Sequence, residues 1–175
     1  MKIRKITELS LLTGLALIIF VVELRFPDIL PVPGVKLGLA NIITVYAVYK
    51  YRACEVFLLV LARIILGTVF ASNFSALIYS LSGALFCLAG MLLLKRIIPV
   101  RWLWLCSTIG AVLHNTGQIA AAIAVMQSFA VIYYYPFLVF CGCIAGAFTG
   151  ICAQLVVNRI GRKGRSYNEK RLFYD

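Results

Sequence analysis

Long apolar blocks alternate with short polar or proline-containing breaks along the 175 residues of the chain. The blocks cover residues 7–24, 36–50, 53–70, 75–94, 102–126 and 134–158. An α-helix needs about 20 predominantly apolar residues to cross the hydrocarbon core of a bilayer. The pattern therefore predicts six membrane-spanning helices, with no soluble domain or internal repeat between them.

The amino-acid composition favours the same fold class. Hydrophobic residues make up 63% of the chain and charged residues 13%, whereas a soluble domain carries about 45–50% apolar and about 25% charged residues. So little polar surface cannot cover an apolar core in water. We expect an all-α integral membrane protein, a compact bundle of six transmembrane helices over residues 1–158, followed by a basic cytoplasmic tail at residues 159–175.

The positions of the basic residues predict the orientation of the bundle. With six spans, all but three of the 17 Lys and Arg residues lie on one side of the membrane. Arg25 and Lys36 lie on the other side, and Arg63 lies inside a span. Basic loops face the cytoplasm in multi-pass proteins. Both termini are therefore expected in the cytoplasm, and the net charge of +11 does not indicate nucleic-acid binding.

The second block is short and follows a proline-rich segment. Its apolar part, residues 37–49, corresponds to ~20 Å of helix against a hydrocarbon core of ~30 Å. Its first residues are therefore expected below the outer surface or covered by protein. Residues 26–34 contain three prolines and a glycine, which restrict the backbone to extended and turn conformations. This segment is either a stiff outer cap or a plain connecting loop.

Polar side chains inside the spans form the candidate site. A polar group in hydrocarbon costs several kcal/mol unless it is paired or faces a polar cavity. With 1.5 Å of rise per residue, six such residues share the outer half of the bilayer, and Lys36 would lie at the mouth of the pocket that they line. The six residues are Asn41, Thr44, Arg63, His114, Asn115 and Gln118. The alternative is that they only tie helices together by buried hydrogen bonds.

Arg63 suggests the chemistry of a ligand. None of the six acidic residues of the sequence is expected at the depth of Arg63. The guanidinium group, Lys36 and the N–H groups at the start of the second helix would all favour negative charge. We therefore expect an anionic or hydrogen-bond-rich molecule.

Two stripes of small residues are candidate contact surfaces. The sixth block contains Gly142, Gly146 and Gly150, spaced four residues apart, and the first block contains Ser10 and Gly14 at the same spacing. Small residues at this spacing allow another helix to approach closely. Each stripe either packs inside the bundle or docks a partner subunit.

Several chemistries lack a motif in this sequence. There is no G-x-x-x-x-G-K-[ST] loop for ATP, and the carboxylates are not clustered as catalytic Mg²⁺ sites require. The single histidine has no Cys or Ser nucleophile at a recognisable spacing, and the six cysteines lack metal-ligand spacing. An enzyme is therefore not expected, and neither is a metal or cofactor.

Two motifs resemble one family. They are residues 33–41 (PGVKLGLAN) and 110–118 (GAVLHNTGQ), supported by residues 63–67 (RIILG) and 80–84 (SLSGA). The sequence resembles the Gx transporter family, which is often labelled heptaprenyl diphosphate synthase component I. The resemblance covers most of the chain, from the first span to the sixth.

The family in turn is similar to the substrate-binding S-components of energy-coupling-factor (ECF) transporters. The resemblance implies a multi-pass protein of the bacterial cytoplasmic membrane that captures a micronutrient or an isoprenoid molecule from outside. It also implies a transmembrane coupling subunit and two cytoplasmic ATPases as partners, with the loop between the first two helices as a lid. The label offers an alternative, a non-catalytic membrane subunit of a prenyl synthase. A stand-alone facilitator is a third possibility.

Overall fold

Six α-helices and two short 3₁₀ helices form the part of the chain that the computed structural model describes, residues 3–25, 38–71 and 75–172. In chain order these elements are α1 (Ile3–Arg25), α2 (Asn41–Lys50), α3 (Ala53–Ala71), α4 (Ser75–Leu94), η1 (Val100–Trp102), α5 (Leu103–Met126), η2 (Phe129–Tyr134) and α6 (Tyr135–Leu172). The described ranges contain no strand, so the prediction of an all-helical protein is confirmed.

Five helical segments of the described residues are long and apolar enough to cross a membrane, judged by length and composition. They are Ile3–Glu23, Ala53–Phe70, Leu77–Leu94, Val100–Met126 and Phe129–Arg159. The exception is α2, which has 10 residues and is therefore only ~15 Å long. The prediction of six helices holds, but α2 is too short to cross a bilayer alone.

The start of α2 differs from the prediction. The apolar pattern placed it near residue 36, whereas the helix begins at Asn41 after a turn. In that turn Gly38 has a φ of 66°, a left-handed conformation that favours glycine, and the Asn41 N–H donates to the Gly38 carbonyl over 2.8 Å. Lys36 and the proline-rich segment 26–34 lie outside the described residues.

α2 lies in the centre of the bundle. Its residues from Ile43 to Val48 are all buried. Lys95 at the end of α4 donates to the Val48 carbonyl over 2.9 Å, which satisfies one of the carbonyls that a helix leaves free at its C-terminus. Around this end of α2 lies a hydrophobic core that includes Val56, Leu88, Met91, Leu103 and Cys106.

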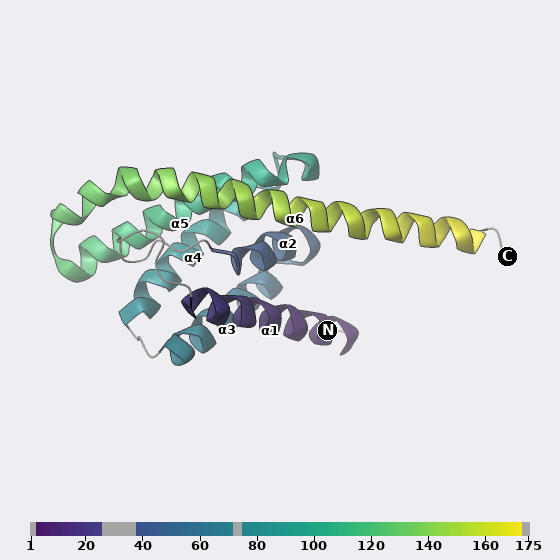
Figure 1. The fold of residues 1–175 in the computed structure, drawn as a ribbon, viewed down its shortest axis with the longest axis horizontal. Coiled ribbons are helices and arrows are strands. Elements are labelled where there is room, and N and C mark those ends of the chain that lie inside the picture. Colours follow the sequence, from purple (N-terminus) through teal and green to yellow (C-terminus); the bar gives the residue numbers. More distant parts are fainter. Residues whose placement is uncertain (1–2, 26–37, 72–74, 173–175) are drawn as a thin grey trace.

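The helices form two groups on either side of α2. α5 packs against α4 and α6, while α1 packs against α3, and α2 contacts both α6 and α3 (Figure 1). Figure 1 also shows α6 running along one side of the bundle and α1 on the opposite side. Any cavity beside α2 is therefore bordered by both groups.

The glycine stripe of α6 faces α5. A Cβ atom added at Gly146 would lie 2.7 Å from the Cβ of Ala111 and 2.9 Å from the Cα of Thr108. Gly150 and Gly142 meet α5 in the same way, at Trp104 and Asn115. Of the two uses left open by the sequence, the structure shows internal packing, because α5 occupies the surface predicted to dock a partner.

The second small-residue stripe is open. Ser10 is exposed, and a Cβ added at Gly14 would meet nothing within 4 Å. Its use as a docking surface stays a prediction.

The C-terminal tail continues α6. The predicted span ended at residue 158, but the helix runs without a break from Tyr135 to Leu172 and projects beyond the bundle (Figure 1). Arginine, lysine and glutamate favour helix, which offsets the cost of about 1 kcal/mol for each glycine in the tail. The backbone of the predicted tail is therefore helical as far as Leu172, and its assignment as a separate cytoplasmic segment stays a prediction.

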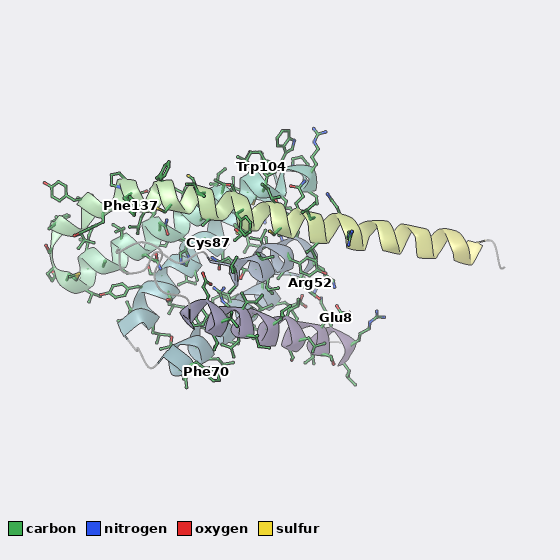
Figure 2. All side chains as sticks on the ribbon, viewed as in Figure 1. Glu8, Arg52, Phe70, Cys87, Trp104 and Phe137 are labelled. Carbon is green, nitrogen blue, oxygen red and sulfur yellow. The ribbon has the colours of Figure 1, made fainter. Side chains whose placement is uncertain are left out.

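Basic helix ends meet at one end of the bundle. Glu8 of α1 accepts hydrogen bonds from Tyr51 (2.8 Å) and Lys50 (3.2 Å), and Lys5 forms an ion pair of 2.7 Å with Glu55 of α3. Figure 2 shows Glu8 and Arg52 at the end where α6 projects. Lys5 and Lys50 thus lie at the same end of the bundle, whereas the side of the membrane that this end faces stays a prediction.

The outer faces of the helices are apolar. Leu11 and Ile18 on α1, Phe70 on α3, Phe86 on α4 and Phe148 on α6 are between 48% and 69% exposed, and Figure 2 shows such side chains pointing away from the bundle. Soluble monomers rarely expose contiguous apolar surface larger than a few hundred Å². This surface is typical of a protein surrounded by lipid.

Candidate functional site

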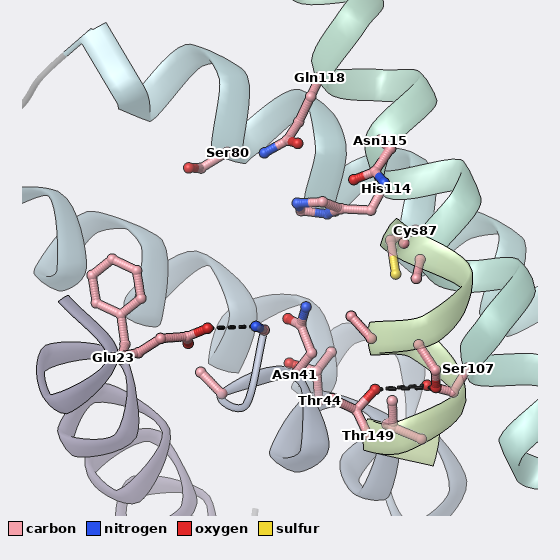
Figure 3. A pocket seen from close by; sticks show the side chains of 18 of the residues that line it. Glu23, Asn41, Thr44, Ser80, Cys87, Ser107, His114, Asn115, Gln118 and Thr149 are labelled. Atoms are coloured by element: carbon pink, nitrogen blue, oxygen red, sulfur yellow. Dashed lines mark hydrogen bonds between the residues drawn. The ribbon is translucent and has the colours of Figure 1, made fainter. Parts of the chain in front are cut away.

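A polar cavity lies between the two helix groups. It has a volume of about 200 Å³, and all six α-helices contribute residues to its wall. Figure 3 shows polar side chains of α1, α2, α4, α5 and α6 directed toward this space. Since a single water occupies ~30 Å³ of liquid, the cavity is large enough for a small molecule.

The residues predicted from the sequence converge on this cavity. All six intramembrane candidates line it, although they come from α2, α3 and α5: Asn41, Thr44, Arg63, His114, Asn115 and Gln118. The seventh predicted residue, Lys36, lies outside the described residues. The structure therefore shows that the six share one cavity, whereas their binding of a ligand stays a prediction.

Arg63 of α3 faces Asn41 of α2. Its Nη1 donates to the Asn41 side-chain oxygen over 3.0 Å, which is the hydrogen bond that the described residues supply to the guanidinium group. Arginine has five N–H donors in a fixed planar arrangement, so most of its donor capacity is directed elsewhere. Asn41 holds one edge of the guanidinium group and leaves the rest for another acceptor.

Glu23 corrects the prediction that no carboxylate shares the depth of Arg63. It lies near the end of α1, is 7% exposed and lines the same cavity. Its carboxylate accepts a hydrogen bond from the Gly38 N–H (Figure 3). The sequence placed Glu23 at the end of a span, where an acidic residue normally meets water, and gave no sign that the turn before α2 would cover it.

His114 and Gln118 lie one turn apart on α5 and pack against Gly83 of α4. A Cβ added at Gly83 would lie 2.8 Å from Gln118 Cγ and 2.9 Å from His114 Cε1. Nearby, the Ser82 hydroxyl donates to the Gly117 carbonyl over 2.8 Å. The missing side chain at Gly83 thus brings α4 close to α5 and positions both polar residues at the cavity wall.

Asn115 has a structural partner. Its Nδ2 donates to the Leu138 carbonyl of α6 over 2.6 Å, and Gly142 leaves room for the amide. The bond between α5 and α6 is the kind of helix tie that the structural alternative proposed. Asn115 therefore serves the fold and also contributes to the cavity wall.

Thr44 and a pair of hydroxyl groups are buried parts of the cavity wall. Thr44 is 6% exposed, and among the described residues its Oγ1 has no hydrogen-bond partner. Ser107 of α5 and Thr149 of α6 are both 3% exposed, and their hydroxyl groups lie 3.3 Å apart (Figure 3). An unpartnered buried hydroxyl costs about 1–3 kcal/mol, so the Thr44 hydroxyl is suited to a ligand or water.

Gln154 lies outside the cavity. Its side-chain oxygen accepts from the Trp104 N–H over 3.4 Å, and its amide donates to the Arg101 carbonyl. It therefore satisfies backbone groups at the start of α5, where an α-helix leaves its first N–H groups free.

No metal site is visible in the described residues: no three His, Cys, Asp or Glu side chains gather there. The polar groups of the cavity are instead hydrogen-bond donors and acceptors with one guanidinium and one carboxylate group. This arrangement is suited to binding a polar molecule.

A family model described as heptaprenyl diphosphate synthase component I matches residues 12–156. The chain belongs to this family. A search of curated proteins found no match, and neither did a search of solved structures. The matched range extends from the middle of α1 into α6 and includes every described residue of the cavity wall.

The short motifs that carry the family resemblance occur at helix crossings beside the cavity. Gly67 of the RIILG motif lies against the Phe20 ring of α1, since a Cβ there would be 2.9 Å from it. Gly117 of the second long motif meets Ser82 and Gly83 of α4. The glycines of these motifs therefore pack α3, which carries Arg63, against α1, and α5, which carries His114 and Gln118, against α4.

The cavity also contains residues that were not among the site residues predicted from the sequence. Besides Glu23 they include Ser80, Cys87, Ser107 and Thr149. Serine and threonine occur throughout membrane helices, where their hydroxyls bond to the backbone one turn earlier, so the sequence alone does not separate those that face a cavity.

The name of the family, a synthase component, implies that its members work with a partner.

Proposed function

We propose that this family member is an integral membrane protein that captures a small polar molecule from outside the cell as the S-component of an ECF-type importer. The observation that carries the proposal is the polar cavity of about 200 Å³, walled by all six helices. A buried polar surface is costly in a bundle whose outer faces are apolar. Binding of a polar ligand gives these groups partners.

The outer surface supports a membrane location. Aromatic residues lie near both ends of α5, with Trp102 and Trp104 before or at its start and Phe129, Tyr133 and Tyr134 after its end. The 24 residues of α5 span ~36 Å, which is slightly more than the hydrocarbon core of ~30 Å. Aromatic side chains concentrate at the two membrane interfaces. We propose the cytoplasmic membrane of a bacterial cell.

The orientation follows from the basic helix ends. We expect the end that carries Lys50 and Arg101 to face the cytoplasm, as the positive-inside rule requires. In a variant without its six native cysteines, a membrane-impermeant maleimide should label Ala130→Cys in intact cells and Arg96→Cys only after the cells are opened. Both positions are exposed. Labelling of Arg96→Cys in intact cells would show the opposite orientation.

The size of the cavity favours a compact ligand. Pockets for drug-sized molecules have volumes of about 300–1,000 Å³, and this cavity has about 200 Å³. A heptaprenyl chain contains seven isoprene units and greatly exceeds that volume. A micronutrient-sized molecule therefore suits the cavity better than a long isoprenoid.

Transport would require partners, because the sequence has no ATP-binding loop. The proposal assigns ATP hydrolysis to two cytoplasmic ATPases and force transmission to a membrane coupling subunit. Affinity purification of the full chain from native membranes should recover these three proteins in fixed proportion. Repeated stoichiometric recovery of a prenyl synthase without them would contradict the transport proposal.

The family description favours a second candidate, a non-catalytic membrane subunit that assists a prenyl synthase. The unclustered carboxylates are consistent with a helper, since catalysis on a diphosphate requires grouped carboxylates for Mg²⁺. In this case the synthase would purify with the chain, and the cavity would have no transported ligand.

A further inference from the structure

Two opposite charges face the cavity without neutralising each other directly. Glu23 and Arg63 both line it. The ion pairs of the described residues involve Glu8 and Glu55 but not Glu23. Each group instead has its own neutral partner, because Glu23 accepts from the Gly38 N–H and Arg63 donates to Asn41. Since both groups line the same cavity, a ligand bound there can contact each of them.

The described part of the cavity wall has no net charge when the imidazole is neutral. Its charged residues are Glu23 and Arg63, whose charges cancel. His114 also lies in the wall and adds no charge while its imidazole is neutral. A single uncompensated ion is expensive in a medium of low dielectric constant. Arg63 by itself would attract a ligand with a net negative charge. In the presence of Glu23, however, the occupied cavity would then contain one uncompensated negative charge.

We propose that the cavity binds a compact molecule without net charge, a zwitterion or a neutral molecule with strong donor and acceptor groups at opposite ends. The anionic or acceptor end faces Arg63, and the cationic or donor end faces Glu23. The unpartnered Thr44 hydroxyl adds a third polar contact. This inference rests on the proposed function and replaces the sequence-based expectation of an anionic ligand.

The charge balance is testable with small ionic probes. The probes are sodium acetate and inorganic phosphate, added to the full chain in detergent micelles at constant ionic strength while thermal unfolding is followed. The wild-type Tm should not change with either probe. Glu23→Gln removes the carboxylate and leaves Arg63 uncompensated, so its Tm should rise with acetate until the site is saturated. The double variant Glu23→Gln with Arg63→Gln should lose this rise.

A matched control distinguishes the cavity from the protein surface. Glu8→Gln removes a carboxylate from the opposite end of α1, where Glu8 bonds to Lys50 and Tyr51. This variant should remain insensitive to acetate, as the wild type is. If Glu23→Gln does not fold, Arg63→Gln supplies the mirror test, since it leaves Glu23 uncompensated and should be stabilised by methylammonium.

The outcomes also separate this inference from the proposed function. A wild-type Tm that rises with acetate or phosphate, and does so only while Arg63 is present, would show an anion site and overturn the inference while leaving a ligand-binding role intact. If neither the wild type nor the single variants respond to any probe, the two charges are closed to solutes and the inference is wrong. The proposed function fails separately, if the chain purifies without transport partners.

Discussion

Replacing Gly146 by leucine is expected to destabilise the bundle by about 3 kcal/mol, the upper end of the usual range for overpacking. Even the first added atom would lie 2.7 Å from the Cβ of Ala111 and 2.9 Å from the Cα of Thr108. The second contact is with backbone, so α5 and α6 would have to separate. Thermal unfolding of the purified variant in detergent measures the effect.

Gly14→Leu is the matched control for this substitution. Gly14 belongs to the other small-residue stripe, and its added Cβ would meet nothing within 4 Å. The Tm of this variant should equal that of the wild type or exceed it slightly, because leucine favours helix more than glycine does. Equal destabilisation by the two substitutions would contradict the packing of α6 against α5.

Replacing Arg63 by glutamine is expected to weaken ligand binding by about 1.5–3 kcal/mol, the range for a hydrogen bond to a charged group. This corresponds to roughly 10- to 150-fold in Kd. Arg63 has donors beyond the one that it gives to Asn41, and the ligand would accept from these. Equilibrium binding of the molecule that co-purifies with the wild type measures the change.

A structural role for Arg63 predicts a different result. If the guanidinium group only ties α3 to α2, Arg63→Gln should lower the Tm of the ligand-free protein and change affinity no more than an unrelated destabilising variant does. Gln154→Ala is that comparison, because Gln154 bonds to the backbone of Trp104 and Arg101 away from the cavity. Equal loss of affinity in the two variants would contradict direct binding by Arg63.

The sequence predicted the helices and the polar cluster well, because both depend on strong local signals. An apolar block of 18 or more residues is read directly from hydropathy. A polar residue such as Arg63 in the middle of such a block is conspicuous, since its cost in hydrocarbon demands a partner or a cavity. Depth along each helix then follows from a rise of 1.5 Å per residue, which brought residues of α2, α3 and α5 to one level.

What the sequence did not predict depends on tertiary contacts. Glu23 enters the cavity because the turn at Gly38 folds over the end of α1. The glycine stripe of α6 is internal because α5 lies along it. Neither fact follows from the spacing of residues within one helix, which describes a helix face without stating what covers that face.

Helix boundaries showed a further limit. α2 begins at Asn41 because Gly38 adopts a positive φ and forms a turn, although the apolar pattern starts earlier. α6 continues to Leu172, because the arginine, lysine and glutamate residues after the apolar span also favour helix. Hydropathy describes where a helix crosses lipid, and the backbone can start later or continue further.

Native mass spectrometry of the gently purified wild-type protein tests the central claim most directly, that the polar cavity binds a small molecule. We predict one compact molecule bound per chain, lost on collisional activation and depleted in Arg63→Gln. Two results together would contradict the claim. The wild type would carry no small molecule, and a metabolite mixture would raise its Tm no more than it raises the Tm of Arg63→Gln.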